Sequence, residues 1–314
     1  MQMPKYIQDF LVYLTAIKGK SQRTRKEYEY DLLLFIRFNV AVRNDLPTDH
    51  LQAIDVSRFT IEDIQQITLE DLYSFLEYCE LVRGNGAASR SRKVATLKSF
   101  FHYLKAKRRL ITDNPTDELE APKISKKQPI YMNMNESLQF LEGLSFSRHY
   151  ERDYCMMTWM LNLGIRVSEL CSLDINSVHN DILTVRGKGD KERNLYLNEQ
   201  CLATLKSYLS VRPAMLKDEN QPALFISQQG TRLTRQSLSK LVRKINDKSG
   251  LNKTKLSPHK LRHTSATLLY KSGADIRSLQ QILGHSNIST TQIYTHVENK
   301  EIQRVISEHP LNKL

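Results

Sequence analysis

The stretch "LSPHKLRHTSATLL", residues 256–269, puts two histidines and an arginine beside a run of small and apolar residues. His259 and Arg262 are three residues apart, so on a helix their side chains would share one face. Taken alone, His259 is a candidate helix cap, and together with His263 and His285 it could ligate a metal ion. No acidic residue lies between the first two histidines and no cysteine lies near them, which disfavours a zinc site.

The charge balance of the chain points to a polyanionic partner. The 314 residues include 46 Lys and Arg against 34 Asp and Glu, a formal net charge of +12. A surface of this sign attracts nucleic acid, because each neutralised phosphate releases counterions. Net charge alone does not separate DNA from RNA or from an anionic membrane. A basic protein with no nucleic-acid role is the further alternative.

No segment has the features of a membrane span or a secretion signal. The longest mostly apolar stretch, residues 154–165, is too short to cross a bilayer. The N-terminus "MQMPKYIQDF" lacks the basic start and apolar core of a signal peptide. Four widely spaced cysteines form no C-x-x-C pair, as is typical of reduced structural thiols: Cys79, Cys155, Cys171 and Cys201. We therefore expect a cytoplasmic protein with no membrane partner.

Apolar residues repeat at helical spacing through the first third of the chain. Gly19 is placed to end one helix, and Ser21 and Thr68 are placed to cap later ones. The segment 88–110 is expected to turn apolar side chains inward and to leave a basic outer face. That face is either a solvated surface or the lining of a groove for nucleic acid. Residues 38–67 are less regular, and we interpret them as an insertion with a short helix of its own.

The helical pattern breaks at residues 111–133, which contain three prolines and a lysine cluster. We predict an exposed linker here, with the domain boundary near residue 122. Further on, residues 181–197 have two β-branched or aromatic runs around a Gly-Lys-Gly-Asp turn, which predicts a hairpin. The predicted fold is mainly α-helical with a small β-hairpin or sheet element, divided into two domains.

The second half carries five potential phosphate ligands or proton donors and one nucleophile: Arg166, Lys188, His259, Arg262, His285 and Tyr294. Each also has a simpler interpretation. Arg166 could form a surface ion pair with Glu169, and Lys188 is typical of an exposed turn. Tyr294 could cap a small hydrophobic cluster. The hairpin sequence "GKGDK" does not have the spacing of a phosphate-binding P-loop.

Taken in chain order, the motifs "RVSEL", a hairpin lysine, "HKLRH", "LGH" and "TTQIYTH" resemble the tyrosine recombinase, or phage integrase, family. The resemblance covers nearly the whole chain, because the first third is similar in layout to the helical core-binding domain of Xer-type recombinases. Two features depart from the pattern. Ser265 lies where many relatives carry an aromatic residue, and the segment 38–67 is longer than in the short Xer proteins.

The resemblance implies three parts: a helical, SAM-like core-binding domain (1–118), a linker (119–130) and a catalytic domain with a C-terminal exchange helix (131–314). It also implies that Tyr294 attacks a DNA phosphate to give a 3′-phosphotyrosyl link. The other five residues of the set match catalytic positions of the family.

Elementary chemistry agrees with those roles. The planar donor forks of two arginines suit the charge that gathers on a pentavalent phosphate. A phenol has a pKa of about 10 and needs a base, for which His259 is the better candidate. His285 would brace the phosphate or the nucleophile, and Lys188 would protonate the leaving 5′-oxygen.

The implied function is site-specific DNA recombination without cofactor, metal ion or ATP, of the Xer type that resolves chromosome dimers. The alternatives are the integrase of a mobile element, a type IB topoisomerase and a non-catalytic DNA-binding protein. The implied partner is double-stranded DNA with a short inverted-repeat site. A dimer would bind each site and a homotetramer would join two sites, with or without an accessory protein, at the nucleoid in the cytoplasm. Basic residues of the helices are candidate DNA contacts: Arg23, Arg25, Arg90, Arg92, Lys98, Arg235, Lys240 and Arg243.

Overall fold

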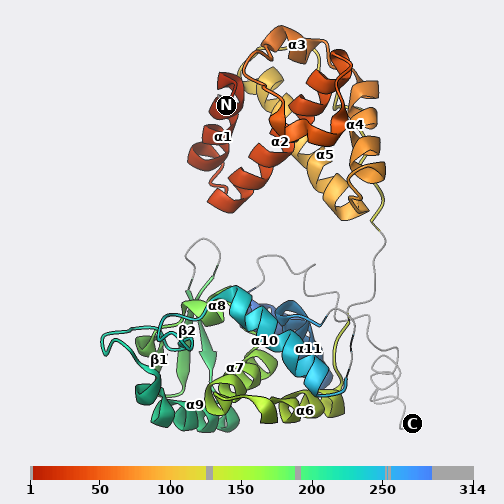
Figure 1. The fold of residues 1–314 in the computed structure, drawn as a ribbon. Helices are drawn as coiled ribbons and strands as arrows, with labels where there is room; N and C mark the ends of the chain where they lie inside the picture. Colours follow the sequence, from red (N-terminus) through yellow and green to blue (C-terminus); the bar gives the residue numbers. More distant parts are fainter. Residues whose placement is uncertain (1–2, 125–129, 188–191, 252, 254–255, 285–314) are drawn as a thin grey trace, which may run out of the picture. The chain divides into compact units, whose positions relative to one another are not determined.

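The structure is a computed structural model that describes residues 3–124, 130–187, 192–251, 253 and 256–284 (Figure 1). The chain divides into two compact units, Met1–Lys126 and Lys127–Leu314. The described residues are mainly helical and include a three-stranded antiparallel sheet, which confirms the predicted fold class. No helix in the described part of the chain is long and apolar enough to cross a membrane.

The first unit is built from helices. They are α1 (Lys5–Val12), α2 (Gln22–Arg43), α3 (Ile61–Gln65), α4 (Leu69–Leu81) and α5 (Ala87–His102). One π-helical turn continues α1 over Tyr13–Ile17, another continues α5 over Tyr103–Lys107, and a 3-10 turn covers Thr48–Ala53.

Two of these helices begin where the sequence predicts. The Ser21 hydroxyl accepts the backbone N–H of Thr24 at 3.2 Å, and the Thr68 hydroxyl accepts the N–H of Asp71 at 3.3 Å. The Asp71 carboxylate in turn accepts the Thr68 N–H at 2.9 Å. Each bond satisfies a donor that the first turn leaves without an intrahelical partner. Gly19, with a φ of +59°, lies after the end of the preceding helix, as predicted.

Aromatic side chains form the centre of the first unit. The phenylalanines with no exposed surface are Phe10, Phe35, Phe75, Phe100 and Phe101. Phe35 meets Phe75 edge to face with ring centroids 5.1 Å apart, an arrangement that aromatic quadrupoles favour. Phe75 and Phe101 belong to the apolar faces predicted for their helices, so those faces are confirmed.

The irregular segment predicted for residues 38–67 is shorter than expected, because α2 continues to Arg43. The short helix expected within it is present as α3. The segment is not peripheral, since Leu51, Val56 and Phe59 are buried in the core of the first unit. The interpretation as an insertion missed this because widely spaced apolar residues give no periodic pattern.

The predicted linker, residues 111–133, is partly buried. Ile111 and Leu119 pack into the core of the first unit, and Met132 packs into the core of the second. The exposed stretch is therefore shorter than predicted. Single apolar residues near the two ends of a polar segment are enough to anchor it, and such residues carry no pattern.

The second unit combines helices with the sheet (Figure 1). Its helices are α6 (Met134–Glu142), α7 (Tyr150–Leu163), α8 (Val167–Ser172), α9 (Glu199–Val211), α10 (Arg235–Lys248), α11 (Pro258–Lys271) and α12 (Ile276–Leu283). Its strands are β1 (Val178–His179), β2 (Ile182–Arg186) and β3 (Glu192–Tyr196). Most of the apolar stretch 154–165 lies in α7, on which Trp159 has no exposed surface.

The predicted hairpin is confirmed. Strands β2 and β3 pair antiparallel, with Leu183 opposite Leu195 and Val185 opposite Arg193. Strand β1 adds to β2 on its other edge, and with two residues it is too short to carry a sequence signal. Because side chains alternate along a strand, one face of the sheet buries Leu183, Val185 and Leu195 in the core.

Candidate active site

The structure describes three of the six residues proposed from sequence as a catalytic set. They come from two places in the chain, the start of α8 (Arg166) and the start of α11 (His259 and Arg262). Both arginines shift the pKa of the histidine, so they lie within electrostatic reach of it. The other three, Lys188, His285 and Tyr294, lie outside the described residues.

The end of α7 and the start of α8 determine the position of Arg166. Gly164 ends α7 with a left-handed φ of 58°, and Arg166 is the N-cap residue of α8. Its backbone N–H donates to a carboxylate oxygen of Glu169 at 2.9 Å, and its guanidinium donates to the other oxygen at 2.6 Å. The guanidinium also donates to the Gly284 carbonyl at 3.0 Å.

The simpler interpretation of Arg166, an ion pair with Glu169, therefore describes part of its environment. The pair is not a surface pair, because the Glu169 side chain is only 3% exposed while that of Arg166 is 35% exposed. A carboxylate this buried is stable only when it is paired and hydrogen-bonded. Burial acts to raise the pKa of Glu169, but the hydrogen bonds and charge of Arg193 and the Arg166 N–H outweigh it and lower that pKa to about 2.

Arg262 is almost fully buried, with 3% of its surface exposed. It lies on the first turn and a half of α11, which begins at Pro258. Its guanidinium donates to the Gly164 carbonyl at 2.6 Å and to the Leu283 carbonyl. These two bonds fix the plane of the Arg262 guanidinium and connect α11 to the C-terminal ends of α7 and α12. An arginine held in this way is preorganised, as electrostatic stabilisation of a transition state requires.

His259 lies in the first turn of α11 and contacts His263 one turn later. Their Nε2 atoms are 3.0 Å apart, and the rings meet edge to face. Partial burial of the ring and the positive charges of Arg262, Lys260 and Arg166 lower the pKa of His259 below its usual value. Burial, His259 and the same cationic neighbours on α11 lower the pKa of His263 to about 4. Both imidazoles are therefore neutral at pH 7, which suits a proton acceptor.

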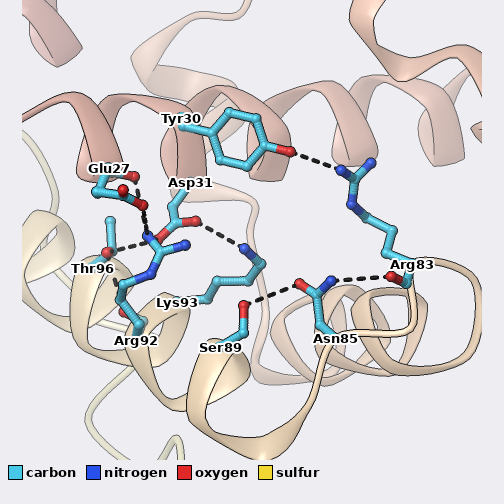
Figure 2. A network of polar contacts seen from close by, with 9 residues as sticks. All are labelled: Glu27, Tyr30, Asp31, Arg83, Asn85, Ser89, Arg92, Lys93 and Thr96. Carbon is cyan, nitrogen blue, oxygen red and sulfur yellow. Dashed lines mark hydrogen bonds and ion pairs between the residues drawn. The ribbon is translucent and has the colours of Figure 1, made fainter. Parts of the chain in front are cut away.

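The basic residues proposed as DNA contacts fall into two groups. Arg23, Lys98, Arg235, Lys240 and Arg243 are exposed, and Arg25 is half-buried. The other two, Arg90 and Arg92, are engaged within the first unit. Arg90 pairs with Glu80 on α4, and Arg92 pairs with Asp31 on α2 (Figure 2). Whether any of the eight contacts DNA stays a prediction.

Two residues of the site were not predicted from the sequence to belong to it. Arg193 on β3 donates both terminal nitrogens to the Glu169 carboxylate, at 2.9 and 2.8 Å. Glu169 was considered only as an alternative partner of Arg166. A glutamate three residues after a helix start is a visible signal for a capping contact. Nothing in the sequence indicated that an arginine 24 positions later would complete the group.

Gly164 offers a test of how tightly the site is packed. An alanine there would have to adopt a φ of +58°, and its Cβ would lie 2.7 Å from Leu283 Cδ2 and 3.2 Å from Ser265 Oγ. We expect Gly164→Ala to lower the free energy of unfolding by about 2 kcal/mol, from backbone strain and displacement of Leu283. Urea unfolding followed by the fluorescence of Trp159 would measure it.

Gly250→Ala is the matched control. Gly250 also has a positive φ, +72°, but its added Cβ would meet only one side-chain atom, at 4.0 Å. It should therefore report backbone strain alone, with a loss of about 1 kcal/mol. Equal losses in the two variants would show that the contact with Leu283 contributes nothing.

The chain is similar to known recombinases over its whole length. Residues 131–301 match the family model described as the phage integrase family, and residues 56–108 match the phage integrase N-terminal SAM-like domain. The chain is 43% identical to tyrosine recombinase XerC of Caldanaerobacter subterraneus subsp. tengcongensis, in an alignment that covers 100% of this chain and 89% of that protein.

Two solved structures share the fold. One is XerH site-specific recombinase bound to palindromic difH substrate, 24% identical, with 96% of this chain and 94% of that chain covered and a TM-score of 0.69. The other is the Tn1549 transposon integrase in complex with transposon right end DNA, 20% identical, with 98% and 99% covered and a TM-score of 0.73. The family match spans more than half of the chain and agrees with the motif order. The chain therefore belongs to the phage integrase family, as an Xer-like tyrosine recombinase.

Proposed function

We propose that this recombinase cuts and rejoins DNA at a specific site through a covalent link between Tyr294 and a 3′-phosphate. The observation that carries the assignment is the binding of Arg166 and Arg262 to the carbonyls of residues 284 and 283, with His259 within electrostatic reach of both arginines. In the sequence, the segment with His285 and Tyr294 begins directly after those carbonyls. Two fixed guanidiniums and a neutral imidazole are the groups that phosphoryl transfer to a phenol needs.

Each group has a defined part in the proposed reaction. The Tyr294 hydroxyl oxygen forms a bond to the scissile phosphorus while its proton passes to His259. Arg166 and Arg262 stabilise the negative charge on the non-bridging oxygens, with His285 as a further donor. The bond from phosphorus to the 5′-oxygen breaks, and Lys188 gives that oxygen its proton. The reverse sequence, with the 5′-hydroxyl of a partner strand as the nucleophile, rejoins the DNA.

We propose the same division of labour along the chain that the sequence implies. Residues 1–118 would form the core-binding domain and 119–130 the linker. Residues 131–314 would form the catalytic domain, ending in an exchange helix. We propose that the exposed basic residues of α10 contact phosphates: Arg235, Lys240 and Arg243. Their exposure supports this, while Leu238, Val242 and Ile245 of the same helix are buried in the core.

The biological setting follows from the Xer-like assignment. We propose that a dimer binds a short inverted-repeat site, that two such dimers form a tetramer, and that the outcome is resolution of chromosome dimers at the nucleoid. The relatives named above include both an Xer protein and a transposon integrase. Excision or integration of a mobile element is therefore the outcome that an experiment must separate from chromosome resolution.

The test is to incubate the full chain with randomly nicked genomic DNA of the source organism, trap covalent adducts with denaturant and sequence the attached DNA. Tyr294→Phe is the control. Adducts that need Tyr294 and gather at one short inverted repeat would support the proposal, and the genomic position of the repeat would separate chromosome resolution from element mobility. Adducts without sequence preference would instead indicate a topoisomerase. Tight DNA binding without adducts from the wild-type protein would contradict the assignment of the nucleophile.

The lowered pKa of His259 predicts the pH dependence of strand cleavage. A base must be neutral to accept the phenol proton, and a histidine with a pKa below 6.5 stays more than half neutral as the pH falls from 8 to 6.5. We therefore expect the single-turnover cleavage rate to fall by less than about twofold over that range. Below the pKa of His259 it should fall by about tenfold for each unit of pH.

His259→Gln should cleave slowly at every pH and lack this acid limb. Fluorescence of Trp159 at each pH would show that the protein remains folded. A cleavage rate that falls by much more than about twofold between pH 8 and 6.5, in folded protein, would argue against His259 as the base.

A further inference from the structure

Three arginines from three different elements hold the carboxyl end of α12. Arg193 donates from Nε to the Ile282 carbonyl at 3.0 Å, Arg262 donates to the Leu283 carbonyl, and Arg166 donates to the Gly284 carbonyl at 3.0 Å. The last turn of a helix leaves its carbonyls without intrahelical donors, and its dipole attracts cations. The last two residues of α12 and its C-cap are thus each bound by one guanidinium.

Arg193 differs from the other two in what its remaining nitrogens do. Both bind the Glu169 carboxylate, one nitrogen to each oxygen, at 2.9 and 2.8 Å. The same carboxylate binds Arg166 through its guanidinium and its backbone N–H. With the Arg193 side chain 14% exposed and that of Glu169 3% exposed, this group is shielded from water. One side chain therefore joins strand β3, helix α8 and helix α12.

The chain is shaped to accommodate this contact. Gly284, the C-cap of α12, has a left-handed φ of +61°, and a Cβ there would lie 3.0 Å from Arg193 Nη1 and 3.2 Å from Cδ and Cζ. Glycine allows both the backbone conformation and the close approach of the guanidinium. The glycine of the "LGH" motif is thus explained by where Arg193 lies.

We infer that Arg193 is a positioning residue for the recombination reaction: it holds Glu169 against Arg166 and fixes the carboxyl end of α12, from which the chain runs in sequence into His285 and Tyr294. The inference rests on the proposed function. Arg193 does not act on the reacting atoms. It acts through Arg166 and through the start of the segment that carries the nucleophile.

Lysine cannot replace this arginine. An ammonium is a single charged point, whereas the guanidinium uses three nitrogens toward two carboxylate oxygens and a carbonyl. We therefore expect Arg193→Lys to slow strand cleavage by roughly 10- to 100-fold, because a displacement of catalytic groups by about 1 Å costs up to 10²-fold. Affinity for the DNA site should change by less than about threefold, since Arg193 is not proposed to touch DNA.

The matched control is Arg212→Lys. Arg212 is also in the second unit, is 5% exposed, and donates to three backbone carbonyls, those of Gln221, Ala223 and Leu224. Among the residues that the structure describes, these hydrogen bonds lie outside the site. A purely structural loss should appear equally in both variants as a lower free energy of unfolding, whereas loss of positioning should appear only in the Arg193 variant.

Two measurements test the inference in the full chain. The first is hydrogen exchange of residues 276–284 without DNA, which Arg193→Lys should accelerate at least tenfold and Arg212→Lys should not. The second is single-turnover cleavage, against affinity, for a nicked duplex carrying the sequence recovered from the wild-type adducts. Unchanged exchange and cleavage in Arg193→Lys, or equal losses in both variants, would overturn the inference.

The pH dependence of strand cleavage is a further test, because loss of a purely structural contact would not change it. In Arg193→Gln, Glu169 remains buried but loses its main cationic partner, so its pKa should rise and it should take up a proton as the pH falls. Cleavage by this variant should therefore decline at a higher pH than cleavage by the wild type. Adding Glu169→Gln should restore the wild-type shape, and persistence of the decline would count against the coupling. Absence of adducts from the wild type would overturn the proposed function instead, and with it any part of Arg193 in that reaction.

Discussion

Replacement of Arg262 by lysine should reduce the rate of strand cleavage by roughly 10²–10³-fold, the loss that follows removal of one preorganised donor to an oxyanion. The guanidinium is 3% exposed and bound to the carbonyls of Gly164 and Leu283. Lysine keeps the charge but cannot make both carbonyl bonds and present a planar fork to a phosphate. Single-turnover cleavage of a nicked site duplex would measure the loss.

Specific DNA binding by Arg262→Lys should stay within about tenfold of wild type, because most affinity for duplex DNA comes from many phosphate contacts. Arg212→Lys serves again as the control for loss of a buried guanidinium. If folded Arg262→Lys cleaves within a few-fold of wild type, Arg262 does not stabilise the transition state. If it loses site binding entirely, its part is recognition instead.

Sequence alone was sufficient for what local patterns encode. The caps at Ser21 and Thr68 depend on residues within three positions, and the hairpin depends on two short runs around one turn. The order of the catalytic motifs identified the family, because five motifs in the same order are far more specific than any one of them. These features require no knowledge of packing.

The parts of the site that were not predicted depend on packing between distant segments. Glu169 and Arg193 are 24 residues apart and come from a helix and a strand. The binding of Arg262 to the Gly164 carbonyl joins residues 98 positions apart. Periodicity predicts which face of a helix or strand is buried, but it does not predict which polar group of another segment that face contacts.

The same limit applies to the basic face predicted for residues 88–110. Arg90 and Arg92 were expected to be available to DNA, yet each is paired with a carboxylate of a neighbouring helix. Lys93, the residue after Arg92, is almost completely buried, with 2% of its surface exposed. The charged face of α5 thus turns partly inward, toward Asp31 on α2 (Figure 2).

Removal of the Asp31 carboxylate should therefore destabilise the first unit strongly. Asp31 is 1% exposed, and it accepts hydrogen bonds from Lys93 Nζ at 2.9 Å, from the Thr96 hydroxyl at 3.2 Å and from Arg92. In Asp31→Ala the Lys93 ammonium would stay buried without its carboxylate. Breaking a buried pair in this way costs about 3–5 kcal/mol of folding free energy.

The control is Glu80→Ala, which removes the partner of Arg90 at a position where the glutamate side chain is 49% exposed. The Arg90 side chain is 16% exposed, but a pair whose carboxylate is open to solvent contributes only about 0–1 kcal/mol. Denaturant unfolding of the full chain would separate the two units, because the single tryptophan, Trp159, belongs to the second. Far-UV circular dichroism follows the unfolding of both units, whereas tryptophan fluorescence follows only the second. Asp31→Ala should therefore shift the circular dichroism transition of the first unit and leave the fluorescence transition unchanged.

A double variant, Asp31→Leu with Lys93→Met, separates the value of the ion pair from the cost of leaving one charge alone. Replacing both buried charges by apolar side chains of similar size is often neutral, since neither charge must then be desolvated. We expect the double variant to recover most of the stability that Asp31→Ala loses. Recovery would mean that the buried pair contributes little net free energy to folding. If the double variant is as unstable as Asp31→Ala, the carboxylate itself, through Arg92 and Thr96, holds α2 and α5 together.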